Sequence, residues 1–236
     1  MSAMTMPAYT PAAAVESAHR TRLLVIAALL ATTSIVAVVG GLLWPAPTGD
    51  WYSYADVAPV REIFWLDLTL VGAAVVLGVP LQAVASMSLV RRRGATWVTV
   101  GAFTVWVGSA LIAVTLGGWA MTYYIATGPG LEPGTATALL DHLARDGHLF
   151  TIGLPGSLMV SIGTILAGVG LIRSRALPLW IPILSILTVG GTFLPSWGPI
   201  SLITNIPTAV VAIAIGSFAY RRAAASTLAD PYQPAQ

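Results

Sequence analysis

Long uncharged apolar runs alternate with short arginine clusters along this chain, and the clusters fall in every second gap between the runs. Each run has roughly the 20 residues that a helix needs to cross the hydrocarbon core of a bilayer. Six runs cover residues 23–43, 65–90, 97–120, 149–172, 177–194 and 199–220. Only 8% of the 236 residues are charged, against about 25% in an average soluble domain. The sequence therefore predicts an all-α, polytopic membrane protein with six transmembrane helices in a bundle.

The fifth run, residues 177–194, is the shortest and contains Pro178 and Pro182. A segment of this length can also lie at the membrane interface or re-enter without crossing. We expect a full span, because without it the arginine clusters would no longer all fall on one side of the membrane.

The arginines predict the orientation, because basic residues in short loops are retained on the cytoplasmic side. Nine of the 11 basic residues fall on one side of the predicted bundle, and only Arg61 and Arg145 fall on the other. The nine are Arg20, Arg22, Arg91, Arg92, Arg93, Arg173, Arg175, Arg221 and Arg222. We therefore expect both termini in the cytoplasm and the chain in the cell membrane, with disordered tails at residues 1–21 and 221–236 around a transmembrane domain at 22–220.

A single ionisable residue, Asp67, interrupts the apolar runs. A charge at the bilayer centre costs at least ~2.5–3.5 kcal/mol on insertion scales, so ionisable groups at depth often mark function. Asp67 lies near the predicted outer end of its run, where water or Arg61 can satisfy it. We expect a structural role, with contact to an ion or substrate as the alternative.

Two amide side chains lie inside the runs beside prolines. Gln82 follows Pro80, and Thr204 and Asn205 precede Pro207. A proline leaves a backbone carbonyl without its hydrogen bond, which a nearby polar side chain can satisfy. We expect these residues to repair their helices or to bond to other helices. The alternative is a polar pocket lined by them together with the carboxyl group described above.

The third and fourth runs are rich in small residues that let helix backbones approach closely. These residues are Gly101, Gly108, Ser109, Gly153, Gly156, Gly163 and Gly168. They predict helix interfaces within the subunit or between subunits, so lipid and either a protein partner or a second copy of the chain are the expected partners.

Two longer loops are predicted on the outer side. The first, residues 44–64, contains prolines and Gly49 and is expected to be ordered and rich in turns. Its aromatic residues Trp51, Tyr52 and Tyr54 suit the headgroup belt. The alternative is an outer recognition surface for a sugar, a lipid headgroup or a partner protein.

The second loop, residues 121–148, is long enough for a helix over 135–146. Leu139, Leu140 and Leu143 would form an apolar stripe lying on the membrane or over the bundle.

The same segment places His142 and Asp146 four residues apart, with His148 just beyond. Imidazole and carboxylate groups in such proximity are candidate metal ligands. No spacing of the HExxH type fixes their geometry, so a solvated helix face is the expected structure.

Several functional classes are excluded or lack their sequence signals. The absence of cysteine excludes disulfides, thiolate metal sites and cysteine nucleophiles. No GxSxG motif, Walker loop or dinucleotide fingerprint stands in a suitable context, and no cofactor is predicted. The Arg91–Arg93 cluster predicts a membrane-anchoring turn, and nucleic acid is not an expected partner.

Three functions fit these observations. The leading hypothesis is a non-enzymatic accessory, interaction or regulatory subunit. The second is a small-solute or lipid-like transporter whose path passes Gln82 and Asn205, although no charge at mid-depth offers coupling to protons or sodium. The third is an outer-face, metal-dependent enzyme that uses Asp141, His142, Asp146 and His148.

Overall fold

The computed structural model describes residues 11–49, 51–146, 148–191 and 197–228, and within these ranges the chain forms helices and loops without a strand. The elements are α1 Pro11–Leu43, α2 Tyr54–Val57, η1 Ala58–Val60, α3 Arg61–Leu89, α4 Ala95–Ala126, α5 Pro133–Asp146, α6 His148–Ser174, α7 Trp180–Gly191, η2 Gly198–Ser201 and α8 Leu202–Leu228. The predicted all-helical class is confirmed.

Five helical segments are long and apolar enough to cross a membrane. They are Ser17–Leu43, Tyr54–Leu89, Ala95–Ala126, Thr151–Ser174 and Gly198–Ala225. Large apolar side chains on them point outward, with Phe103 58% exposed and Ile203 64% exposed. Helices that are apolar on all faces are typical of a membrane environment. These features support a membrane-embedded protein.

The predicted fifth span, residues 177–194, is only partly helical in the described residues. The helix α7 has 12 residues, which corresponds to a length of about 18 Å, less than the ~30 Å hydrocarbon core. It ends at Gly191, and residues 192–196 lie outside the described chain. Six spans and the membrane orientation of the termini therefore stay predictions.

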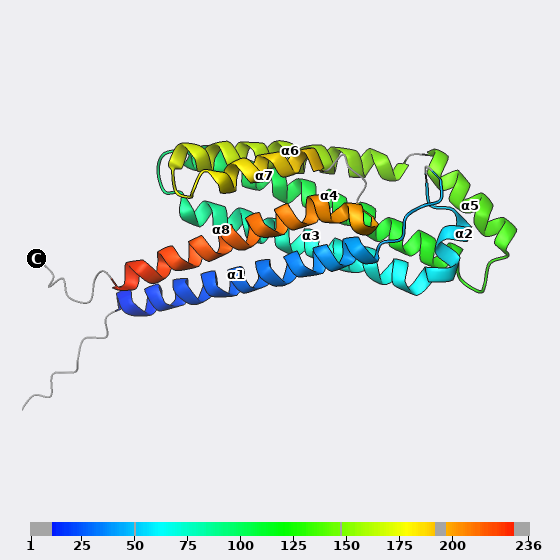
Figure 1. The fold of residues 1–236 in the computed structure, drawn as a ribbon, viewed down its shortest axis with the longest axis horizontal. Helices are drawn as coiled ribbons and strands as arrows, with labels where there is room; N and C mark the ends of the chain where they lie inside the picture. Colours follow the sequence, from blue (N-terminus) through cyan, green and yellow to red (C-terminus); the bar gives the residue numbers. More distant parts are fainter. Residues whose placement is uncertain (1–10, 50, 147, 192–196, 229–236) are drawn as a thin grey trace, which may run out of the picture.

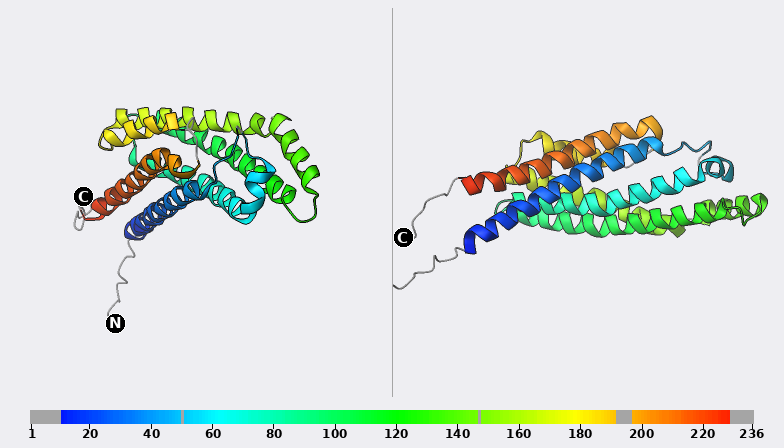
Figure 2. Two further views of the ribbon diagram at one scale, coloured as in Figure 1. Left: turned by 45° about the vertical axis from the view of Figure 1, so that its right-hand side comes forward. Right: turned by 90° about the horizontal axis from the view of Figure 1, so that it is seen from below.

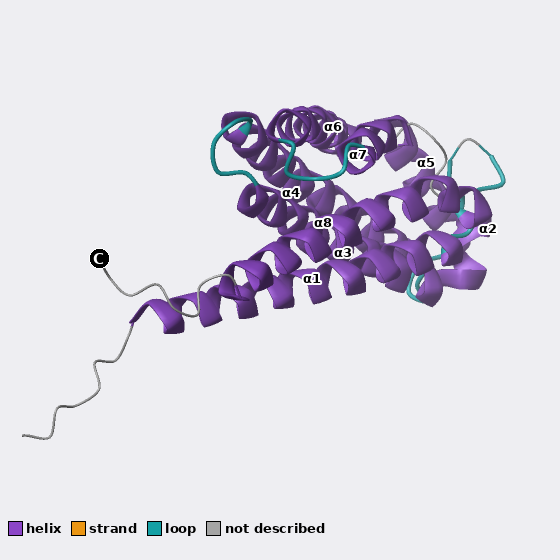
Figure 3. Cartoon of the chain, turned by 60° about the vertical axis from the view of Figure 1, so that its left-hand side comes forward, coloured by secondary structure: helices purple, strands orange, loops and turns teal. Residues whose placement is uncertain are grey.

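The long helices run along the bundle, with α1 and α8 inclined to α4 and α6, and they form two groups joined by α3 (Figures 1 and 2). On one side α4 packs against α6, and on the other α1 packs against α8; α3 contacts both α1 and α4. The helix α7 packs against α6 and α8, and Figure 3 shows the bundle from a further direction. The start of α1 and the end of α8 lie at the same end of the bundle.

That end, which we call the arginine end, carries the arginine turns between α3 and α4 and between α6 and α7. Arg222 on α8 donates from Nη1 to the Leu89 carbonyl oxygen at 3.0 Å, which ties α8 to the last turn of α3. The opposite end, called the aromatic end, carries α2, η1, α5 and the loop before α2. The helices α1 and α8 also extend into residues 11–21 and 221–228, which the sequence analysis assigned to tails.

Glycines hold α4 and α6 close together within one chain. A Cβ atom built on Gly101 would lie 2.5 Å from the Gly163 carbonyl oxygen. A Cβ atom built on Gly108 would lie 2.6 Å from the Gly156 carbonyl oxygen. Only glycine allows backbones to approach so closely. These small-residue faces are therefore used inside the subunit.

Candidate functional site

The aromatic end is closed by a layer of ring contacts centred on Tyr52. Its ring centroid lies 5.1 Å from that of Phe64 and 6.4 Å from that of Trp197. The Tyr52 hydroxyl donates to the Pro45 carbonyl oxygen at 2.7 Å, and the Tyr123 hydroxyl donates to the Tyr52 carbonyl oxygen at 3.2 Å. Burial raises the pKa of the Tyr52 hydroxyl above its ordinary value. This hydroxyl therefore stays protonated and acts as a hydrogen-bond donor.

The predicted outer loop 44–64 is turn-like only in its first part, because the short helices α2 and η1 and the start of α3 occupy residues 54–64. Ser53 caps the short helix α2, since its hydroxyl accepts from the Asp56 backbone N–H while the Asp56 carboxylate accepts from the Ser53 backbone N–H. Trp51, Tyr52 and Tyr54 are half-buried, and Trp51 packs edge-on against Trp119 at 5.2 Å. The proposed outer recognition surface is therefore engaged, at least in part, in packing within the chain.

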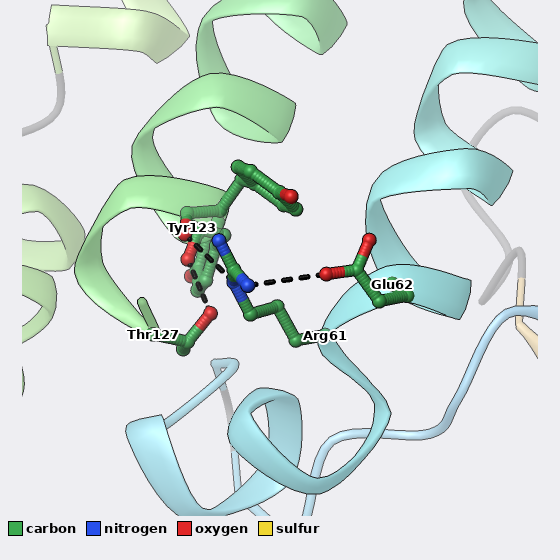
Figure 4. Close-up of polar contacts among 5 residues, drawn as sticks. Arg61, Glu62, Tyr123 and Thr127 are labelled. Atoms are coloured by element: carbon green, nitrogen blue, oxygen red, sulfur yellow. Dashed lines mark hydrogen bonds and ion pairs between the residues drawn. The ribbon is translucent and has the colours of Figure 1, made fainter. Parts of the chain in front are cut away.

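Arg61 is held at the rim of the aromatic layer (Figure 4). Its guanidinium carbon lies 3.6 Å from the centroid of the Tyr124 ring, and its Nε donates to the Tyr124 carbonyl oxygen at 3.0 Å. Its Nη1 pairs with Glu62 Oε1 at 3.1 Å. The same view shows the Thr127 hydroxyl, which donates to the Tyr123 carbonyl oxygen at 2.7 Å.

Asp67 lies beneath this layer without an ionic partner. The side chain is 1% exposed, and neither carboxylate oxygen has a hydrogen-bond partner among the described residues. Arg61, the partner considered from the sequence, binds Glu62 and Tyr124 instead. Pairing with Arg61 is therefore not what this structure shows, because the first helical turns of α3 separate the two side chains.

A glycine pair on α1 lies between Asp67 and the start of α8. A Cβ atom on Gly40 would lie 2.9 Å from Asp67 Oδ1, and one on Gly41 would lie 2.8 Å from Ser201 Oγ and also meet the Asn205 amide. Asn205 Nδ2 donates to the Ala37 carbonyl oxygen at 3.3 Å. One turn of α1 thus contacts the carboxyl group on one side and the amide on the other.

A cavity of about 290 Å³ extends from this turn into the bundle between α1, α3 and α8. Its wall includes Trp44 and Asn205 toward the aromatic end and Gln82 toward the arginine end. We call it the large cavity. Its lining is mostly apolar, and its size is near the lower end for small-molecule sites.

A second cavity of about 140 Å³, the small cavity, lies between α3, α4, α6, α7 and α8. It shares four wall residues with the large cavity, namely Val79, Gln82, Val160 and Thr208. Its wall continues to Ser86 and Leu171 near the arginine end. Together the two cavities follow most of the length of the bundle.

Some polar groups in these walls, Gln82 and Ser161 among them, have no hydrogen bond to the described residues. The Gln82 amide makes none with the described residues, and the hydroxyl of Ser161, which is 6% exposed, is buried without a partner among them. By contrast, the Thr33 hydroxyl donates to the Leu29 carbonyl oxygen within its own helix. Unpaired polar groups in an apolar environment are costly, so Gln82 and Ser161 are available to a ligand or to water.

The predicted polar pocket is thus only partly assembled in one place. Gln82 and Asn205 line the large cavity, whereas Asp67 and Thr204 are not among its lining residues. The Thr204 hydroxyl donates to the Ser201 carbonyl oxygen at 3.0 Å. Its methyl group faces Gly191 of α7, because a Cβ atom there would lie 3.0 Å from Thr204 Cβ.

The predicted helix in the second outer loop is present as α5, but its packing face differs from the prediction. Ala136 and Leu140 are buried against the bundle, Leu143 packs beside them, and Leu139 is 41% exposed. Leu139 therefore does not belong to the packed stripe. The inward face follows the four-residue spacing of Ala136 and Leu140.

The metal hypothesis for this segment stays a prediction. His142 is exposed, and Asp141 Oδ2 lies 3.9 Å from Arg145 Nη2. The side chains of Asp146 and His148 lie outside the described residues. Among the side chains that are described, no three His, Asp or Glu residues are placed to hold one metal ion.

A scan against protein-family models and searches of curated proteins and of solved structures found no match to this chain. The residues and cavities described above therefore carry the functional proposal.

The sequence analysis did not single out Ser161, Gly40 or Gly41. A lone serine within an apolar helix usually bonds to its own backbone, so Ser161 gave no distinctive signal. Gly40 and Gly41 are adjacent near the end of the first run, and such a pair could have indicated that another helix approaches closely there.

Proposed function

We propose that this protein binds a small, uncharged and mainly apolar molecule inside the membrane and serves as a carrier for it, as a small-solute or lipid-like transporter would. The observation that carries the proposal is the unpartnered Gln82 amide in the shared wall of the two cavities. An amide offers two N–H donors and a carbonyl acceptor, and none of these bonds to a described residue.

The lining defines the chemistry of the ligand. Apolar side chains dominate both cavities, and among the described residues no charged side chain lines either one. A charged ligand would therefore lose its hydration without gaining a counter-ion. A molecule with one or two hydroxyl, carbonyl or amide groups on an apolar body would bond to Gln82 and Ser161 and fill the remaining space.

Transport is supported by the course of the cavities. They share a wall at Gln82, and they reach from Trp44 near the aromatic end to Leu171 near the arginine end. A ligand could pass between them through small shifts of the shared side chains. The cell membrane is the proposed location, because the arginine distribution predicts a cytoplasmic arginine end.

An accessory or regulatory role, the leading hypothesis from the sequence, draws less support from the geometry. The small-residue faces of α4 and α6 are used within the chain. The outward-facing side chains are the large apolar ones that lipid also contacts. In the part of the chain that the structure describes, no specific surface favours this role over the proposed carrier.

The carrier proposal is tested by placing single cysteines in a chain that has none of its own. Gln82→Cys is expected to react with a water-soluble thiol reagent, because a transport path must admit water at the polar group in the shared wall of the two cavities. Leu77→Cys on the same helix is the matched control, since Leu77 is 52% exposed on the outside of the bundle and is expected to face lipid. If Gln82→Cys reacts from neither side of the membrane, that result would contradict a transport path.

Native mass spectrometry of the purified protein tests the binding step. We expect a small molecule at fixed stoichiometry, bound about five- to tenfold more weakly after Gln82→Met or Ser161→Ala, because each change removes one hydrogen bond. Ser157→Ala is the control, since the Ser157 hydroxyl donates to the Gly153 carbonyl oxygen instead. Copurification of a protein partner at fixed stoichiometry, without a small molecule, would favour the accessory-subunit hypothesis.

A further inference from the structure

The carboxyl group of Asp67 is the one acidic group sealed inside the described part of the bundle. It is 1% exposed and both oxygens lack hydrogen bonds to the described residues. One turn beyond Gly40, directly after α1, the Trp44 indole N–H is also buried without a hydrogen-bond partner among the described residues. Burying an ionised carboxylate without partners is very unfavourable, so such a group is neutral in a dry site.

The surrounding elements supply no cation to this site. From the loop before α2 and from α4, the titratable neighbours are Tyr52 and Tyr123, whose hydroxyls donate to backbone carbonyls. On α2, the Asp56 carboxylate is bound by Ser53 and by the Thr48 backbone N–H. At the rim, Arg61 pairs with Glu62. Near Gly40 and near the start of α8, the described residues of α1, η2 and α8 include no charged residue.

The position of Asp67 links its charge to the large cavity. Its Oδ1 faces Gly40, and the next residue, Gly41, lines the cavity beside Asn205. The side chain lies less than two turns from the start of α3, or about 9 Å along the helix axis. The α1–α3 contact at Gly40 therefore lies beside both the carboxyl group and the wall of the large cavity.

We propose that Asp67 is a proton-binding site that gates the aromatic end of the large cavity. With the proton bound, the neutral carboxyl group packs against Gly40 and the end is closed. When the O–H bond breaks, the proton passes to water and the carboxylate keeps the electron pair. The anion then requires hydration, so α1 separates from α3 and the cavity opens. This inference rests on the proposed carrier function and supplies the proton coupling that the apolar mid-depth lacks.

Infrared spectroscopy of the protein in lipid nanodiscs tests proton binding directly, without any ligand. A protonated carboxyl group in a dry site gives a carbonyl band distinct from that of a carboxylate. We expect this band in the wild-type chain at neutral pH, its loss at alkaline pH and its absence in Asp67→Asn. Glu62→Gln is the matched acid-to-amide control, because the Glu62 side chain is 67% exposed, and it should retain the band.

A spectrum without the band at neutral pH, or a band that survives in Asp67→Asn, would overturn the proton site. Gly40→Ala provides a second variant if Asp67→Asn does not fold. Its added methyl group would press on Asp67 Oδ1, with a built Cβ only 2.9 Å away. We expect the band to shift in this variant, and an unshifted band would assign the signal to another acid.

Gating is measured with Ser34→Cys, whose side chain lines the large cavity. The rate at which this cysteine reacts with a membrane-impermeant thiol reagent is divided by the rate for Thr137→Cys, which lies on the exposed side of α5. This ratio corrects for the ionisation of the thiol. We expect the ratio to rise about tenfold per pH unit until Asp67 has titrated, as linkage requires. In Asp67→Asn the ratio should stay low and flat. A flat ratio in the wild-type chain would overturn the gate.

The two proposals fail separately. A pH-dependent Asp67 band together with an unreactive Gln82→Cys would contradict the carrier function and keep the proton site. A reactive Gln82→Cys without the band would contradict the proton site alone.

Discussion

The α4–α6 interface and the α1–α3–α8 region are both built from small residues, yet one is closed and the other contains a cavity. Between α4 and α6, glycine faces glycine, as at Gly101 and Gly163, so the backbones meet. Around the cavity, glycines face polar side chains, because Gly41 lies against Asn205 and Gly78 against Thr33.

The difference shows that a small residue specifies close packing only when its partner is also small. Opposite a longer polar side chain, the same glycine makes room for that group inside the bundle. We therefore expect substitutions in the first region to act on stability, whereas those in the second act mainly on the cavity.

The largest effect is expected from Gly101→Ala. Its Cβ would lie 2.5 Å from the Gly163 carbonyl oxygen and 2.6 Å from the Ala167 backbone nitrogen, and backbone atoms cannot rotate away. We expect the free energy of unfolding to fall by roughly 1–3 kcal/mol, measured by denaturant titration in detergent.

Gly117→Ala is the control on the same helix, since nothing lies within 4 Å of its built Cβ. It should be neutral or should stabilise the helix by up to about 1 kcal/mol. Equal losses in both variants would show that helix distortion, and not the contact with α6, sets the cost.

A smaller loss of stability is expected from Gly41→Ala. The added methyl group meets the Ser201 and Asn205 side chains, which can rotate. The Asn205 bond to the Ala37 carbonyl oxygen would be lost, at a cost of about 1 kcal/mol. We expect reagent access to Ser34→Cys to change more clearly than stability does. Gly72→Ala is the control, since its nearest neighbour is Leu116 Cβ at 3.8 Å, and it should leave access unchanged.

Arg222→Gln tests whether the hydrogen bond between α8 and α3 stabilises the helices around the cavity at the arginine end. The lost bond to the Leu89 carbonyl oxygen is expected to lower the free energy of unfolding by about 0.5–1 kcal/mol. Arg221→Gln is the neighbouring control, because it removes the same charge, whereas the bond to the Leu89 carbonyl oxygen comes from Arg222. An equal loss in this control would assign the effect to overall charge.

The smallest effect on stability is expected from Gln82→Met. The amide has no hydrogen bond to lose within the described residues, and its apolar replacement fits the cavity wall. Unfolding free energy should stay unchanged or rise by up to about 1 kcal/mol. Asn205→Leu should instead lower it, since that side chain bonds to α1. A clear loss in Gln82→Met would mean that the amide has a structural partner, which would weaken the carrier proposal.

Local pattern predicted the helices well. The long apolar runs correspond to α1, α3, α4, α6 and α8, and the helix in the second outer loop is present as α5. The prediction was less accurate where neighbours decide the outcome. The helix α3 begins at Arg61, ahead of the run at Trp65, because η1 leads directly into it.

The candidate site was predictable only in part. Gln82 and Asn205 stood out because they are amides in apolar helices, and both line the large cavity. Ser161 and the depth of Asp67 did not stand out, since position along a helix does not reveal which neighbours surround a side chain.

The sequence by itself determined that this protein is helical and membrane-embedded, because hydrophobic run length and charge placement act through the solvent and need no partner. Only the tertiary structure decided that Asp67 is sealed against Gly40, that the glycines of α4 and α6 pair within the chain, and that Gln82 joins two cavities. Those features depend on which side chains of different helices contact one another. These contacts form only when the helices pack together in the folded chain.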